Sequence, residues 1–174
     1  MGLLNLEGET RIDIGGGNSP VGGAASLDIR PLPTTQILCN ATNILLPHNR
    51  FNYIHCWNTL QYLTFQESNK ALKEMFRILK PNGKMRLVVP RFSYYVESTA
   101  IIGGYYTNVY QAACGHQMHD YDVVKSVYSV ESEFRQFILY AIPNATILDK
   151  SHDLYRLRKE HESEIQIILT KERF

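Results

Sequence analysis

Short apolar segments closed by turn-forming residues fill the first part of the chain. Residues 11–14 run directly into a loop with the sequence GGGNSP, and residues 25–29 run into RPLP. Glycine, asparagine and proline interrupt regular structure, so each of these apolar segments ends where they begin. Residues 36–39 and 53–57 are two further runs of strand length. The pattern therefore predicts four short strands before residue 58, with no segment long enough for a helix.

The clearest predicted helix begins after Thr64. Thr64 and Glu67 have the spacing of a capping box, in which each side chain accepts a hydrogen bond from an amide that the first turn leaves unpaired. Apolar residues then recur at helical spacing, with charged residues on the opposite face, at Ala71, Leu72, Met75, Phe76 and Leu79. We expect the helix to stop at residues 80–83, KPNG, and a strand to follow over residues 85–89.

A strand, a helix, a turn and a second strand in this order form a crossover unit, which places its strands parallel. The fold class is therefore α/β. The pattern weakens over residues 91–129, which we interpret as a loop region, partly helical, over the carboxyl edge of the sheet. Helical spacing returns over residues 131–141, and residues 145–149 and 165–169 have the pattern of two further strands.

Composition narrows the class of protein. The chain has 174 residues, 44% of them hydrophobic and 11% aromatic, which favours one compact domain over residues 1–174. Its 18 basic and 17 acidic residues give a net charge of +1, which disfavours a nucleic-acid binder. No apolar run has membrane-spanning length, and Glu7 and Glu9 do not suit a signal peptide. Since the three cysteines have no paired spacing, we expect a reducing, cytoplasmic compartment. The lack of a long apolar run leads us to expect no contact with a membrane.

The candidate chemistry gathers where the predicted strands end. In open α/β sheets ligands bind outside the carboxyl ends of the strands, and this edge holds Gly15 to Gly17, Asp28, Asn40, Trp57, Asn58 and Arg91. A carboxylate at the end of the second strand can accept two hydrogen bonds from a ribose diol. The glycine loop and Asp28 together indicate a cofactor that contains a nucleoside.

The spacing argues against two common cofactor sites. A dinucleotide fold needs a full helix after the glycines, but position 20 is proline and only ten residues separate Gly17 from Asp28. This disfavours a nicotinamide-dependent oxidoreductase. No Gly-Lys-Ser or Gly-Lys-Thr follows the glycines, which excludes a P-loop. A nucleoside cofactor without phosphates fits better.

Four segments together resemble one enzyme family. They are RIDIGGGNSP at 11–20, SLDI at 26–29, FNYIH at 51–55 and ALKEMFRILKPNGKMRLVVP at 71–90. In order and spacing they are similar to the class I S-adenosylmethionine-dependent methyltransferases, in particular to small bacterial members. The resemblance implies a Rossmann-like fold, with a mostly parallel twisted sheet flanked by helices and an antiparallel C-terminal strand.

The resemblance also implies that S-adenosyl-L-methionine is the cofactor. Asp13 and the glycines would lie along its methionine part, Asp28 would bind the ribose, and Asn40 would accept a hydrogen bond from the adenine amino group. Trp57 and Asn58 would border the sulfonium. The implied cofactor-binding residues are Asp13, Gly15, Gly16, Gly17, Asp28, Ile29, Asn40, Ala41, Trp57 and Asn58.

The expected reaction is methyl transfer to a small-molecule acceptor, such as a glycan or another hydroxyl compound. A hydroxyl acceptor would be helped by a base, for which His116, His119 and Tyr121 are the catalytic candidates. The two histidines could instead ligate a metal, but no further ligand cluster is evident, so we expect none.

Two hypotheses stay open beside this one. Asn40, Asn52 and Gln61 replace residues that are acidic in many members of the family. An alternative is therefore a catalytically inactive S-adenosylmethionine-binding protein of the same fold. A homodimer is a further hypothesis, because the short first crossover leaves little helix to cover one face of the sheet.

Overall fold

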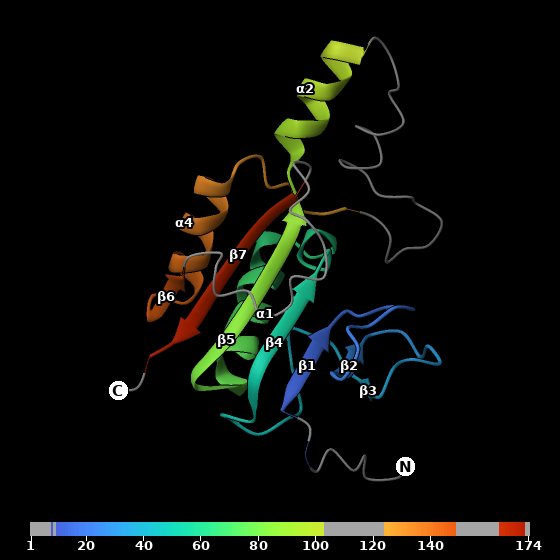
Figure 1. Cartoon of the computed structure of the whole chain (residues 1–174), viewed down its shortest axis with the longest axis vertical. Helices are drawn as coiled ribbons and strands as arrows, with labels where there is room; N and C mark the ends of the chain where they lie inside the picture. Colours follow the sequence, from blue (N-terminus) through green and yellow to red (C-terminus); the bar gives the residue numbers. More distant parts are fainter. Residues whose placement is uncertain (1–7, 9, 103–123, 149–163, 173–174) are drawn as a thin grey trace.

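The structure is a computed structural model that describes residues 8, 10–102, 124–148 and 164–172. The described strands form one sheet with the order β3-β2-β1-β4-β5-β7-β6 (Figure 1). They are β1 (Arg11–Ile14), β2 (Ala25–Asp28), β3 (Ile37–Leu38), β4 (Phe51–Trp57), β5 (Leu79–Pro90), β6 (Ala145–Leu148) and β7 (Glu164–Lys171).

The pairing within this sheet is mostly parallel. β1 pairs in parallel with β2 and β4, and the pairs β2–β3 and β4–β5 are parallel as well. β7 runs antiparallel to both β5 and β6. The α/β class, the Rossmann-like sheet and the antiparallel C-terminal strand are confirmed. All four strands expected before residue 58 are present.

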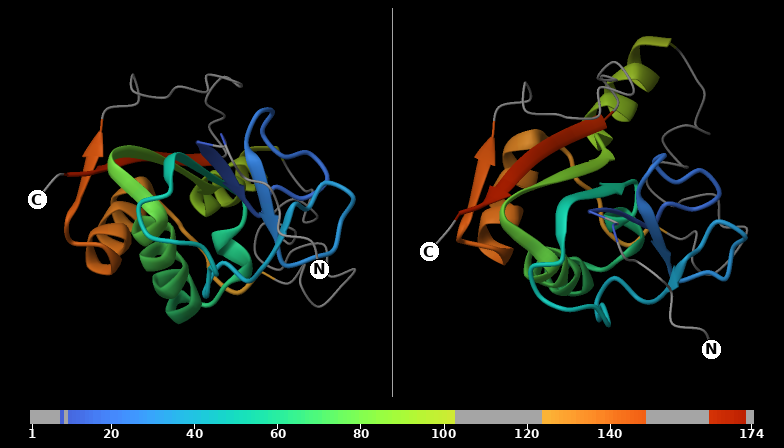
Figure 2. Two further views of the ribbon diagram at one scale, coloured as in Figure 1. Left: turned by 90° about the horizontal axis from the view of Figure 1, so that it is seen from below. Right: turned by 60° about the horizontal axis from the view of Figure 1, so that its bottom comes forward.

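Two helices cover one face of the sheet. α1 (Phe65–Ile78) and α4 (Glu131–Ala141) contact each other and lie on the same side of the strands (Figure 2). Leu72 and Met75 of α1 and Phe134 and Ile138 of α4 are fully buried in one cluster with the inward side chains of β1, β2, β4, β5 and β7. The amphipathic pattern that predicted both helices therefore follows from packing on this face.

Helix α1 begins as predicted and ends earlier than predicted. The Thr64 hydroxyl accepts a hydrogen bond from the Glu67 amide, and the Glu67 carboxylate accepts one from the Thr64 amide, which completes the capping box. The helix ends at Ile78, and the KPNG segment expected to follow it forms an irregularity inside β5, between Leu79 and Lys84. Pro81 disfavours helical geometry at Lys80, and the chain is already extended one residue earlier, at Leu79.

The first two crossovers contain no helix. β1 and β2 are joined by residues 15–24, and β2 and β3 by residues 29–36, and both connections consist of turns, bends and irregular backbone. The absence of a helix between β1 and β2 agrees with the prediction that the interval from Gly17 to Asp28 leaves little room for one. Parallel strands are usually joined by a helix that covers the sheet, so the β1–β2–β3 half is covered differently from the rest.

The sheet face opposite α1 and α4 carries a row of buried polar side chains. Asp13 lies beside Ser26 on β2 and His55 on β4, and His55 lies beside Arg86 on β5. The Arg86 guanidinium lies 3.4 Å from His55 Nδ1 and donates a 3.0 Å hydrogen bond to Gln166 Oε1. Successive residues of a strand point to opposite faces, so this row alternates with the apolar residues of the core.

The second half of the chain matches the predicted elements where the structure describes it. The region expected to be partly helical contains α2 (Phe92–Ile102), which extends past the end of β5 (Figure 1). Helix α4 and strands β6 and β7 lie at the expected positions. Among the described helices, none has the length and apolar character needed to cross a membrane. The assignment of residues 1–174 to one domain stays a prediction.

Candidate functional site

A cleft of about 480 Å³ lies at the carboxyl ends of β1, β2 and β4. This is the edge at which ligands bind in open α/β sheets, and the volume is in the range of small-molecule pockets. Six of the residues predicted to bind the cofactor line it, namely Gly15, Asp28, Ile29, Asn40, Ala41 and Asn58. The apolar side chain of Ile29 is 59% exposed, so it offers a surface on which a planar ring could pack.

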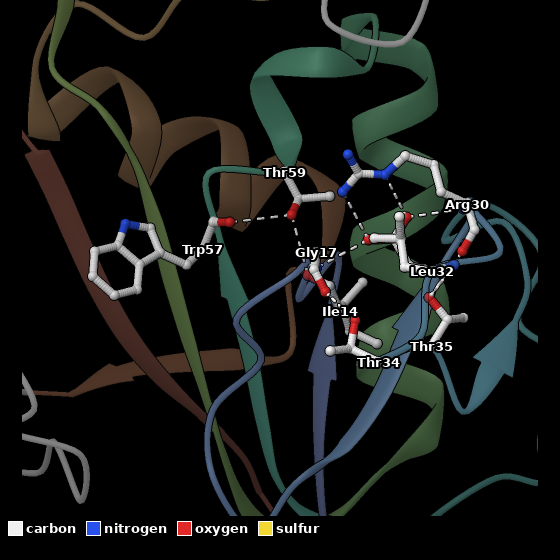
Figure 3. A network of polar contacts seen from close by, with 9 residues as sticks. Ile14, Gly17, Arg30, Leu32, Thr34, Thr35, Trp57 and Thr59 are labelled. Carbon is white, nitrogen blue, oxygen red and sulfur yellow. Dashed lines mark hydrogen bonds and ion pairs between the residues drawn. The ribbon is translucent and has the colours of Figure 1, made fainter.

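Gly15 holds the end of β1 against β4. Its φ is +73°, and a Cβ there would overlap the Thr59 hydroxyl and lie 2.7 Å from Thr59 Cγ2. The Thr59 hydroxyl lies 3.1 Å from the Ile14 carbonyl oxygen and 3.2 Å from that of Trp57, so it joins the ends of both strands (Figure 3). The Gly15 amide donates a 2.7 Å hydrogen bond to the Leu27 carbonyl of β2. Only glycine fits this position.

The rest of the glycine loop is tied to the loop after β2. The Thr34 hydroxyl donates to the Gly17 carbonyl oxygen (Figure 3), and the Gly17 amide donates a 3.1 Å hydrogen bond to Asp28 Oδ2. Gly17 has a φ of +58°, while a Cβ on Gly16 would lie 2.8 Å from Pro20. The loop is therefore a folded structure of its own and not a lead into a helix.

The Asp28 carboxylate is saturated by donors from its own chain. Oδ1 accepts 2.9 Å and 3.0 Å hydrogen bonds from the Arg30 amide and Nε, and Oδ2 accepts 3.1 Å bonds from Arg30 Nη2 and the Gly17 amide. In Figure 3, dashed lines join the Arg30 guanidinium to this carboxylate. Burial, which leaves Asp28 3% exposed, acts to raise its pKa, but these bonds together hold the pKa below its ordinary value. Asp28 is therefore ionised.

Asn40 is engaged in a similar way. Its side-chain oxygen accepts 2.9 Å hydrogen bonds from both the Thr42 amide and the Thr42 hydroxyl, which closes a local turn. This oxygen is the atom expected to accept from the adenine amino group. Both acceptors expected to recognise the nucleoside are thus already bonded within the chain.

Asp13 and Trp57 face a second, neighbouring cavity. It has a volume of about 470 Å³, shares Gly15 and Asn58 with the cleft, and is lined by Gly16 and Glu164 as well. Asp13 Oδ2 accepts a 2.8 Å hydrogen bond from the Val21 amide. Burial raises the pKa of Asp13 to about 6, against the lowering effect of that bond. The Trp57 indole donates to the Glu164 carboxylate, which turns the ring toward β7.

The three catalytic candidates, His116, His119 and Tyr121, lie outside the described residues. The cleft also contains residues that sequence reasoning missed, including Arg30, Thr59, Tyr62, Glu67 and Lys125. The contact between Arg30 and Asp28 could have been predicted locally, because an arginine two residues after an aspartate can donate to its carboxylate. Thr59 had none, because its contact with Gly15 depends on the pairing of β1 with β4.

Comparison with known proteins shows which families resemble this chain. The family model of a methyltransferase domain matches residues 24–83, which hold β2, β3, β4, α1 and the start of β5. Over this segment the chain is similar to the methyltransferase domains of that family. The matched segment ends at Gly83, the last residue of the KPNG segment. No curated protein sequence matches the chain.

Solved structures share the methyltransferase fold at low sequence identity. An S-adenosylmethionine-dependent methyltransferase from Clostridium acetobutylicum has a TM-score of 0.61 and 12% identity, over 94% of this chain and 84% of that one. One from Mesorhizobium loti has a TM-score of 0.58 and 12% identity, over 92% and 90%. A complex of the Haloferax volcanii Trm112 methyltransferase activator with a putative methyltransferase has a TM-score of 0.60 and 14% identity, over 95% of this chain and 84% of that one.

The cleft can be compared with what a methyltransferase cofactor requires. Its volume, the glycine that lets backbone line the cavity, the carboxylate at the end of β2 and the exposed apolar Ile29 all fit a nucleoside. In addition, the Asp28 carboxylate and the Asn40 side-chain oxygen already accept hydrogen bonds from this chain.

Replacing Gly15 with alanine tests the contact with Thr59. Because φ is positive and the new Cβ would overlap the Thr59 side chain, we expect the free energy of unfolding to fall by about 2 kcal/mol. Urea unfolding measures it. Gly22→Ala is the matched control, since a Cβ there meets nothing within 4 Å. Equal stabilities for the two variants would contradict the role of Gly15.

Replacing Asp13 with asparagine tests its raised pKa. The folded chain keeps a proton on Asp13 that the unfolded chain releases, so the native protein loses stability as pH rises from about 4 to about 6. An asparagine side chain at this position does not titrate. We therefore expect the variant to gain about 3 kcal/mol relative to the native chain over this window.

Urea unfolding at several pH values provides the comparison, with the exposed Glu133→Gln as the control for a lost carboxylate. Stability profiles for native chain and Asp13→Asn that stay parallel from acid to neutral pH would show that Asp13 titrates normally.

Proposed function

We propose that the cleft binds S-adenosylmethionine and that the chain transfers its methyl group to a small-molecule acceptor, such as a glycan or another hydroxyl compound. The observation that carries the proposal is the convergence of six predicted cofactor residues on one cleft at the carboxyl ends of β1, β2 and β4. They come from four separate segments of the chain, so a chance cluster of turn residues does not account for them.

Each part of the cleft has a distinct task in this proposal. Asp28 would bind the ribose hydroxyls, Ile29 and Ala41 would pack on the adenine, and the backbone at Gly15 would lie along the cofactor. S-adenosylmethionine supplies a methyl group on a positively charged sulfur, which needs no further activation. The chain's own work is then to align the two partners and exclude water.

A hydroxyl acceptor must lose its proton, for which we keep His116, His119 and Tyr121 as the candidate bases. The assignment of Asp13, Gly16, Gly17, Trp57 and Asn58 to the methionine end of the cofactor also stays part of the proposal. Asp13 and Trp57 line the second cavity, which meets the cleft at Gly15 and Asn58. This continuity supports a cofactor that reaches from one cavity toward the other.

An S-adenosylmethionine-binding protein without turnover is the second candidate. It is favoured by Asn40, Asn52 and Gln61, which stand where many members of the family have acidic residues. The two candidates predict the same binding and differ only in methyl transfer. Transfer of a labelled methyl group to a panel of glycans and small hydroxyl compounds separates them.

Calorimetric titration with S-adenosylmethionine and S-adenosylhomocysteine tests cofactor binding. We expect both to bind, and Asp28→Ala to weaken binding at least about tenfold because the ribose loses a charged acceptor. Glu133→Ala removes an exposed carboxylate from α4 and should leave binding unchanged. If neither compound binds the folded native chain or a folded variant that lacks the Arg30 side chain, the proposed function is wrong.

A cytoplasmic location and a homodimer complete the proposal. Cys39 and Cys56 are free thiols in the structure, which suits a reducing compartment. The helix-free crossovers of the β1–β2–β3 half support self-association. Light scattering should give twice the mass of one chain, and a monomer mass at micromolar concentration would remove the dimer.

A further inference from the structure

We propose that Arg30 competes with the cofactor for the Asp28 carboxylate, so that a ribose diol binds only when the Arg30 guanidinium has moved away. The inference rests on the proposed function, because it concerns the same cleft. It goes beyond that function by assigning to one side chain the control of access to the ribose position.

The hydrogen-bond count at Asp28 makes the two partners mutually exclusive. A carboxylate offers about four lone-pair sites, and in this structure four donors occupy them. Two of these donors are backbone amides, from Gly17 and Arg30, and two belong to the guanidinium. A ribose diol brings two hydroxyl donors of its own. If the guanidinium leaves, the hydroxyls can replace its two bonds one for one while the amides stay in place.

The side chain of Arg30 can leave without disturbing its backbone. The Arg30 carbonyl oxygen accepts hydrogen bonds of 2.9 Å from the Leu32 amide and 2.8 Å from the Thr35 hydroxyl, which fix the turn after β2. The side chain itself is 30% exposed, whereas Asp28 is 3% exposed. Rotation about its own bonds is enough to carry the guanidinium into the open part of the cleft.

The position of Arg30 makes the competition direct. Arg30 lines the same cleft as Asp28, and its Nη2 lies 3.3 Å from where a Cβ on Gly17 would stand. The guanidinium therefore covers the loop along which the cofactor is proposed to lie. Because a two-point bond between guanidinium and carboxylate is among the stronger polar contacts, the closed arrangement lowers the apparent affinity for any ligand that needs Asp28.

The test compares S-adenosylhomocysteine binding to the native chain, Arg30→Met and Arg135→Met by calorimetry. Methionine keeps an unbranched side chain of similar length and removes every donor. Arg135 forms a half-exposed ion pair with Glu131 on α4, so its replacement is a matched loss of an arginine from an ion pair. Circular dichroism establishes that each variant is folded. If Arg30→Met does not fold, Arg30→Ala replaces it as the test variant.

We expect Arg30→Met to bind at least about tenfold more tightly than the native chain, with Arg135→Met unchanged. Binding by Arg30→Met alone also supports the competition, and would show that the native chain is closed to its cofactor. If the native chain binds and Arg30→Met binds equally or more weakly, the inference is wrong while the proposed function stands. If no folded variant binds, both are wrong.

A carboxyl NMR titration of Asp28 separates these results from a simple loss of structure. The pKa of Asp28 should lie below its ordinary value in the native chain and rise in Arg30→Met, since two of its four hydrogen bonds are lost. An unchanged pKa would show that the guanidinium does not bind the carboxylate in solution, and would overturn the inference without reference to any ligand.

Discussion

The close approach of Gly15 to Thr59 holds the functional edge of the sheet together. At this point β1 ends, its glycine amide binds β2, and the threonine hydroxyl after β4 binds the last carbonyl of β1. A side chain on Gly15 would separate these three strand ends. The cleft, the glycine loop and the position of Asp28 all depend on that one contact, because each is built from the chain immediately after these strands.

The cleft combines a methyltransferase framework with acceptors that its own chain already satisfies. Ionised Asp28 suits a ribose, yet its lone pairs face Gly17 and Arg30, and the oxygen of Asn40 faces Thr42. A buried carboxylate needs partners whenever a ligand is absent. The arrangement therefore compensates the buried charge within the chain, and a ligand has to supply equivalent bonds before it can displace these donors.

Local signals in the sequence were sufficient for the elements and for the edge of the sheet at which the cleft lies. The capping box and apolar spacing of α1 act within one helix, and the turn residues after β1 and β2 act within a few positions, so each could be predicted. The end of α1 was misplaced because Pro81 acts on the residue before it, and the KPNG turn then fits inside β5. Contacts between distant segments were out of reach. No residue near Gly15 in the sequence indicates its contact with Thr59. The hydrogen bonds from Thr42 to the Asn40 side-chain oxygen depend on the Asn40 rotamer.

The helix-free crossovers divide the sheet into halves of unequal cooperativity. β4, β5 and β7 are long strands packed on α1 and α4, whereas β1, β2 and β3 span four residues or fewer and are joined by turns. Short strands that are joined only by turns open in local fluctuations below the free energy of global unfolding. Asp28 belongs to this weaker half. Amide hydrogens of β1 and β2 should therefore exchange early, and a ligand held by Asp28 would slow their exchange more than that of β5.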